Sequence, residues 1–88
     1  MGGLLSISKL LGISNTEISG EVDFNSITGL GIYRVSTGEF ANFPSDANKL
    51  GSILLVIPWD ENTIYQFLVS INQRFFFRTI NTDWTRVI

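Results

Sequence analysis

Residues 52–88 carry three runs of β-branched and aromatic side chains that predict a sheet with two apolar faces. The runs cover residues 52–57, 63–71 and 74–80, and Asn72-Gln73 is the expected two-residue turn between the last two. A chain of 88 residues is too short to cover both faces, so the second face is expected to meet another copy. Because side chains alternate along a strand, one face would carry Tyr65, Phe67, Val69, Phe76 and Ile80, and the other Ile64, Leu68, Phe75 and Phe77.

Composition agrees with an oligomeric β module. Charged residues make up only 16% of the chain, against about 25% in an average soluble protein. A small monomer has a high ratio of surface to volume and needs more charge than this. The length allows one domain at most. The net charge is −2 and the arginines do not cluster in the sequence, so nucleic acid is not an expected partner.

The missing residue types exclude several kinds of chemistry. The chain has no histidine, which is the commonest catalytic base and transition-metal ligand, and no cysteine. We therefore expect no catalytic residues, no metal and no cofactor. No stretch approaches the roughly 20 apolar residues of a membrane span, so membrane insertion is not expected.

The N-terminal residues predict a short helix ahead of the sheet. Leu4, Ile7 and Leu11 recur at helical spacing, and Gly12 stands where a helix would stop. About two turns of helix are marginal alone, so this segment needs other copies of itself, the sheet or a longer upstream stalk. We therefore divide the chain into a helical and connector segment, residues 1–20, and a small antiparallel β knob, residues 21–88.

The remaining elements are short. Asp23 has the chemistry of an N-cap for a tight helical turn over residues 23–28, and Gly29 and Gly31 precede the next strand. A long loop is expected between Thr37 and Leu50. The other expected strands cover residues 17–22, 32–35 and 84–88.

These pieces, in this order, resemble the pyocin-knob type of phage tail-fibre module. The resemblance covers Asp23 to Ile88, and the chain differs from the family by having Arg86-Val87 where a second tryptophan is common. It implies a β-rich knob, usually homotrimeric, near the tip of a fibre in the extracellular virion. Such modules are associated with attachment to host-surface glycans or with connecting other fibre segments. The matching pieces are Asp23-Phe24-Asn25-Ser26-Ile27-Thr28, Gly31-Ile32-Tyr33-Arg34-Val35, Pro44, residues 51–57, Tyr65-Gln66-Phe67, Phe77-Arg78-Thr79 and residues 84–88.

The candidate ligand contacts combine amphipathic aromatics with polar neighbours. A sugar presents apolar C–H patches to aromatic faces and hydroxyls to planar polar groups, and Trp59 followed by Asp60 and Asn62 offers both. Tyr33 and Asn42 are the further candidates, the latter within the Glu39–Lys49 loop. The competing interpretation is that Trp59 caps the core with its N–H toward solvent.

Two side chains are expected to be structural. Trp84 opens a strand between apolar neighbours and is expected in the core. Arg78 lies among phenylalanines, and a buried arginine needs a partner, which Glu21, Asp23 or Asp83 could supply.

Two functions follow from these expectations. The first is a homotrimeric fibre-tip module that holds a bacterial surface polysaccharide, with avidity from several copies. The second is a structural module that trimerises or caps the fibre without binding a ligand. An enzyme ranks third, because the adjacent carboxylates Asp60 and Glu61 do not face each other as a glycosidase pair must.

Overall fold

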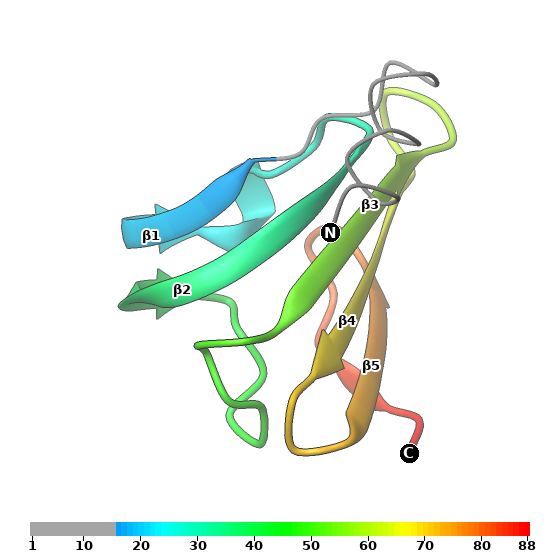
Figure 1. Cartoon of the computed structure of the whole chain (residues 1–88). Coiled ribbons are helices and arrows are strands. Elements are labelled where there is room, and N and C mark those ends of the chain that lie inside the picture. Colours follow the sequence, from blue (N-terminus) through cyan, green and yellow to red (C-terminus); the bar gives the residue numbers. More distant parts are fainter. Residues whose placement is uncertain (1–15) are drawn as a thin grey trace, which may run out of the picture.

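The computed structural model describes residues 16–88, which form a six-stranded mixed sheet with strand order β1-β2-β3-β4-β5-β6 (Figure 1). The prediction of a small, mainly β domain is confirmed, whereas the predicted helix over residues 4–11 lies outside the described part. The homotrimer stays a prediction. The elements are β1 (Glu17–Asp23), a 3-10 turn η1 (Phe24–Ser26), β2 (Gly31–Ala41), β3 (Ile53–Pro58), β4 (Ile64–Ser70), β5 (Arg74–Thr79) and β6 (Thr85–Arg86).

The sheet is not purely antiparallel, because β1 and β2 run parallel, with Asp23 opposite Ala41. The segment 24–30, which contains η1, carries the chain back from the end of β1 to the start of β2. Parallel strands usually need a crossover of about a dozen residues, and the purely antiparallel knob predicted from the sequence is wrong at this pair of strands. A Cβ on Gly38 would lie 2.1 Å from the Gly20 carbonyl oxygen, and this close approach of the strands therefore requires glycine.

β2 belongs to two parts of the sheet. It pairs with β3 over Gly31–Arg34 and with β1 over Arg34–Ala41. Beyond the β2–β3 pairing the strands splay apart, as Figure 1 shows, and the loop after β2 connects the end of β2 to the start of β3. β2 is longer than the predicted strand, which shortens the predicted loop of residues 37–50 to the segment after Ala41.

The register of the β4–β5 hairpin differs by one residue from the prediction. Ser70 pairs with Arg74 and Leu68 with Phe76, so three residues, Ile71 to Gln73, form the loop. The Gln73 N–H donates to the Ser70 carbonyl at 2.9 Å, and Gln73 has a φ of 65°. A turn followed by a left-handed residue is a common three-residue hairpin loop.

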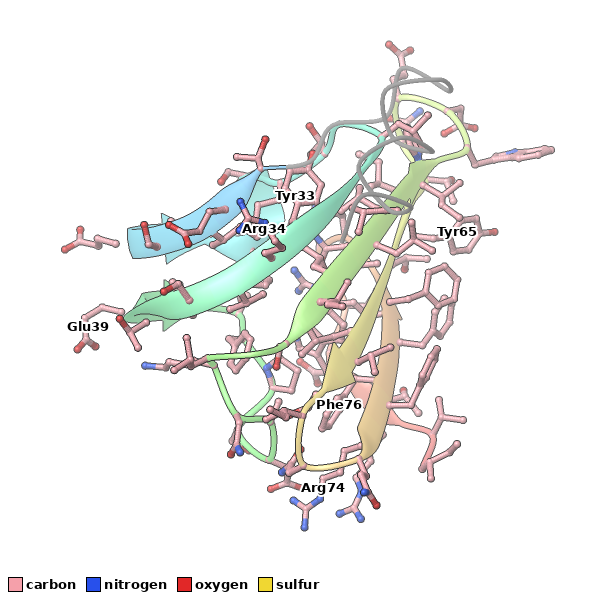
Figure 2. All side chains as sticks on the ribbon, viewed as in Figure 1. Tyr33, Arg34, Glu39, Tyr65, Arg74 and Phe76 are labelled. Carbon is pink, nitrogen blue, oxygen red and sulfur yellow. The ribbon has the colours of Figure 1, made fainter. Side chains whose placement is uncertain are left out.

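The one-residue shift moves side chains to opposite faces. Phe76 joins Ile64 and Leu68 on the inner face, while Phe75 and Phe77 lie on the outer face, which corrects the predicted sets. Figure 2 shows Tyr65 and Phe76 on opposite sides of the β4–β5 hairpin.

The inner face holds the core. Phe24, from η1, is fully buried, and its ring packs against those of Phe40 and Phe43 at centroid distances of 5.4 and 5.2 Å. Asp23 caps η1 as predicted, since its carboxylate accepts the Asn25 N–H at 2.9 Å. The buried apolar residues are Ile18, Phe24, Val35, Leu54, Val56, Ile64, Leu68 and Phe76.

The outer face of the hairpin and β3 is also apolar, as predicted. We call "outer face" the eight side chains that alternate away from the core on β3, β4 and β5. Tyr65, Phe67 and Phe77 form a ring cluster on it, with Phe67 and Phe77 centroids 5.1 Å apart. Ile53 and Val69 are 41% and 47% exposed. The outer face consists of Ile53, Leu55, Ile57, Tyr65, Phe67, Val69, Phe75 and Phe77.

Candidate functional site

The five predicted ligand contacts lie in three separate places. Trp59, Asp60 and Asn62 share the turn between β3 and β4, Tyr33 lies within β2, and Asn42 directly follows β2. The structure therefore brings three of them together in one turn and leaves the other two elsewhere.

The β3–β4 turn is held by Asp60. Its Oδ1 atom accepts the N–H groups of Asn62 at 2.8 Å and Thr63 at 2.7 Å, and the Trp59 N–H donates to the Thr63 carbonyl at 2.8 Å. Trp59 is 76% exposed, so its ring does not cap the core of the described domain. These hydrogen bonds fix the turn that carries the exposed Trp59 ring.

Tyr33 and Asn42 both hold neighbouring segments in place. The Tyr33 hydroxyl donates to the Gly29 carbonyl at 2.7 Å, which fixes the segment leading into β2. Asn42 has a φ of 59°, and its Nδ2 donates to Asp23 Oδ1 at 2.8 Å. The Asn42 carbonyl accepts the indole N–H of Trp84 at 2.7 Å. Asn42 thus links the end of β1 to the C-terminal segment.

The surroundings of Asp23 and Arg78 lower the pKa of both side chains. Hydrogen bonds from the Asn42 side chain and the Asn25 backbone N–H, together with the charge of Arg78, hold the pKa of Asp23 below its ordinary value of 3.8. Burial lowers the pKa of Arg78, and the charge of Asp23 opposes that effect.

Arg78 is buried, as predicted, but its close partner is not a carboxylate. Its Nε donates to Gln66 Oε1 at 2.8 Å and its Nη1 to the Thr82 carbonyl at 3.2 Å. Asp23 acts on it only through its charge. The guanidinium also lies over the Trp84 ring, 4.8 Å from its centroid.

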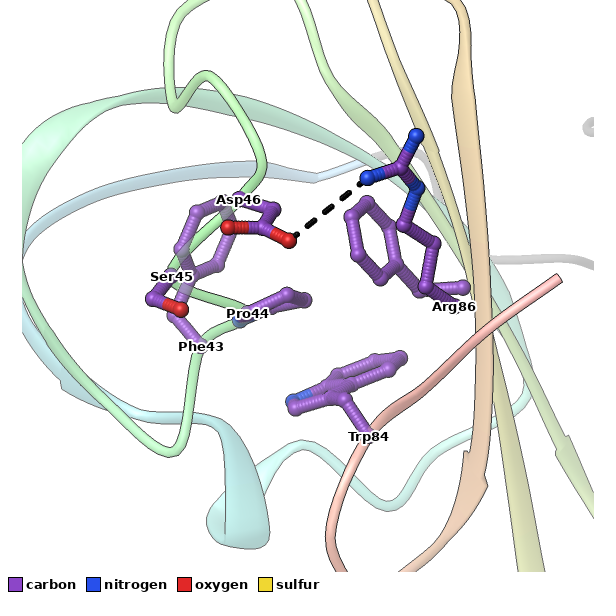
Figure 3. A pocket seen from close by; sticks show the side chains of 7 residues that line it. Phe43, Pro44, Ser45, Asp46, Trp84 and Arg86 are labelled. Atoms are coloured by element: carbon purple, nitrogen blue, oxygen red, sulfur yellow. Dashed lines mark ion pairs between the residues drawn. The ribbon is translucent and has the colours of Figure 1, made fainter. Parts of the chain in front are cut away.

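A pocket of about 300 Å³ opens between the loop after β2 and the segment around β6. Figure 3 shows the Trp84 ring on one side of this pocket and the ion pair of Asp46 and Arg86 on the other. The pocket is lined by Phe43, Pro44, Ser45, Asp46, Phe76, Trp84 and Arg86.

Trp84 is a fixed wall of the pocket. Its N–H is bound to the Asn42 carbonyl and the Arg78 guanidinium packs over its ring, so two contacts set its orientation. The ring is half-buried and still lines the pocket, which is more exposed than the core position predicted for it. A held aromatic ring with a free surface binds apolar patches of a ligand with little loss of side-chain entropy.

The opposite wall is charged and accessible. Asp46 Oδ2 lies 3.7 Å from Arg86 Nη1, and both side chains are about half-exposed. An exposed ion pair of this length contributes little to stability. Breaking it therefore costs little free energy, and both side chains can form hydrogen bonds with a ligand. Arg74 Nη1 donates to the Asp46 backbone carbonyl at 3.0 Å and steadies the loop. The pocket therefore offers an aromatic platform, donors and acceptors within one small space.

The described residues, 16–88, carry no group of three acidic side chains placed to hold a metal ion. In the same range no helix is long and apolar enough to cross a membrane. Comparison of the chain with known protein families, with curated proteins and with solved structures finds no match.

Proposed function

We propose that this chain is a tail-fibre module of a phage or phage-tail-like particle, which works as a homotrimer in the extracellular virion and holds a bacterial surface polysaccharide. The order of sequence pieces supports the fibre assignment. The observation that supports glycan binding is the pocket in which Trp84 faces the half-exposed ion pair of Asp46 and Arg86. Other fibre segments are the expected covalent or packing neighbours.

The pocket fits a sugar residue by its chemistry. The apolar side of a pyranose would pack on Trp84, while its hydroxyls would donate to the Asp46 carboxylate and accept from Arg86. The Ser45 hydroxyl serves either role. Only one or two sugar residues fit in about 300 Å³, so single-site affinity is low. Three copies on one fibre raise the strength of attachment by avidity.

The β3–β4 turn is a second contact region. Trp59 is exposed, and Asp60 retains one carboxylate oxygen, Oδ2, for a ligand after Oδ1 has bonded the turn. Trp59→Ala is expected to weaken attachment to host cells and to leave the assembly intact.

The test is binding of the purified protein to host cells and to a glycan array. Arg86→Gln removes the guanidinium and its positive charge from the pocket, and Arg34→Gln is its matched control, since Arg34 is an exposed arginine on β2. We expect Arg86→Gln to weaken binding at least tenfold, or about 1.4 kcal/mol, and Arg34→Gln to bind as the wild type. The mass of each variant shows whether assembly has been kept.

Three results contradict parts of the proposal. If Arg86→Gln binds normally and Trp59→Ala does not, the site is the β3–β4 turn. If both variants bind normally, neither region contacts the glycan. If the wild-type protein binds no cell and no glycan, the second candidate function replaces the first. That candidate is a structural module that trimerises or caps the fibre, and the exposed outer face favours it.

A further inference from the structure

The outer face is a continuous apolar surface on three neighbouring strands. Its side chains form cross-strand rows, one with Ile53, Val69 and Phe75, and the next with Leu55, Phe67 and Phe77. The last row begins with Ile57 and Tyr65 and ends at Thr79, where the surface becomes polar. With strands about 4.8 Å apart and about 3.3 Å per residue, the face spans roughly 250 Å² in projection.

We propose that the outer face is the surface through which copies of this chain pack against one another. The proposal gives the homotrimer proposed above its contact surface, and to that extent it rests on the proposed function. The largest apolar patch on a typical monomer has a comparable size, a few hundred Å², and such patches are often functional. The eight side chains of this face include one polar group, the Tyr65 hydroxyl.

The two ends of the face differ in shape and in side-chain type. At the aromatic end, a hollow of about 430 Å³ is lined by Ile57, Tyr65, Phe67, Phe75, Phe77 and Val87. At the other end, the aliphatic side chains of Ile53 and Val69 are 41% and 47% exposed. An aliphatic end that enters the hollow of the next copy makes a head-to-tail contact, and such contacts form a closed ring when the rotation between copies closes.

Charge favours another copy over a lipid surface. Protein surfaces that lie on membranes are usually rimmed by lysine and arginine, whereas this chain has a net charge of −2. The three strands bring no charged side chain onto the outer face, so packing copies together opposes no like charges there. The nearest charged position on the neighbouring strand is Arg34, which pairs with Ile53.

The first test measures mass in solution by sedimentation equilibrium over a range of concentrations. Val69→Glu places a charge on the outer face at a position that is 47% exposed, and Leu50→Glu makes a similar change at a loop position that is 63% exposed. We expect the wild type and Leu50→Glu to have a mass about three times the 9.8 kDa of one chain. Val69→Glu is expected to be a monomer.

The second test does not depend on whether Val69→Glu folds. Because the chain has no cysteine, Val69→Cys and Leu50→Cys each introduce a single thiol for maleimide labelling. Packing of copies should make the thiol at position 69 react at least tenfold more slowly than the one at position 50. Dilution below the dissociation constant should remove the difference.

The outcomes separate this proposal from the proposed function. An oligomeric wild type whose mass survives Val69→Glu, with equal labelling at both thiols, overturns the outer face as the contact and leaves the trimer standing. A monomeric wild type at every concentration overturns both. Binding of the wild type to neutral lipid vesicles, together with a monomeric mass, assigns the face to lipid instead. Loss of glycan binding in Arg86→Gln with unchanged mass bears only on the pocket.

Discussion

Gln66 and Arg78 lie opposite each other on β4 and β5 and share a 2.8 Å hydrogen bond inside the core. Gln66 is completely buried and Arg78 is 3% exposed. The Gln66 Nε2 also donates to the carbonyls of Phe24 at 2.8 Å and Ile27 at 3.0 Å. One amide thus joins the hairpin, the buried arginine and the crossover between β1 and β2.

Gln66→Leu should destabilise the domain strongly. It leaves the Ile27 carbonyl and the buried, charged Arg78 Nε without their partner and removes one of two donors from the Phe24 carbonyl, and each buried group left unpaired costs about 1–3 kcal/mol. We expect a loss of at least about 3 kcal/mol in the free energy of unfolding, measured in urea. The double variant with Arg78→Leu should lose less than the sum of the two single changes. Additive losses would show that the two side chains are not coupled.

The strands could be predicted from the sequence because β-branched and aromatic runs specify them locally. The hairpin register could not. The three-residue loop depends on a left-handed conformation at Gln73, and glutamine does not indicate one as glycine or asparagine would. The parallel pairing of β1 with β2 could not be predicted either, because the crossover over residues 24–30 is shorter than such connections usually are.

The pocket could not be predicted from the sequence for a different reason. Its walls come from the loop after β2 and from residues 84–86, and two long-range contacts bring them together. These are the pairing of Phe76 with Arg86 and the bond from the Trp84 N–H to the Asn42 carbonyl. No local pattern encodes either contact, although the predicted Glu39–Lys49 loop does contain the residues of one wall. Trp84 was expected in the core because an indole beside apolar neighbours is usually buried.

Phe76→Ala should be among the most damaging substitutions. Phe76 is 3% exposed on the inner face, and loss of a buried phenylalanine side chain costs about 3–5 kcal/mol. Phe77→Ala is the matched control on the outer face. Both should be measured in the Val69→Glu background, so that assembly does not contribute to the urea midpoint. Phe77→Ala should then cost clearly less, and an equal or larger loss would contradict the observed register.

Gln73→Gly should stabilise the domain. Gln73 has a φ of 65°, a conformation that costs a residue with a Cβ about 1–2 kcal/mol relative to the right-handed region. Glycine removes that strain but adds freedom to the unfolded chain, so we expect a net gain of about 0.5–1 kcal/mol. Gln73→Ala keeps the strain and should give no such gain. The measurement is the urea midpoint, and a loss of stability in Gln73→Gly would mean that the glutamine side chain supports the loop.

Asp23 should give the domain an acid-sensitive part of its stability. The Asn42 side chain, the Asn25 N–H and the charge of Arg78 lower its pKa in the folded state below 3.8, so folding favours the ionised carboxylate. This contribution is fully present above the unfolded pKa and is lost as pH falls through the lower folded pKa. Asp23→Asn should therefore be less stable than the wild type at neutral pH, and the difference should shrink as the pH falls below 3.8. Asp83→Asn, a change at another exposed aspartate, is the control for the loss of one carboxylate. A difference between Asp23→Asn and the wild type that is constant across this pH range would show that the hydrogen bonds, and not the charge, carry the effect.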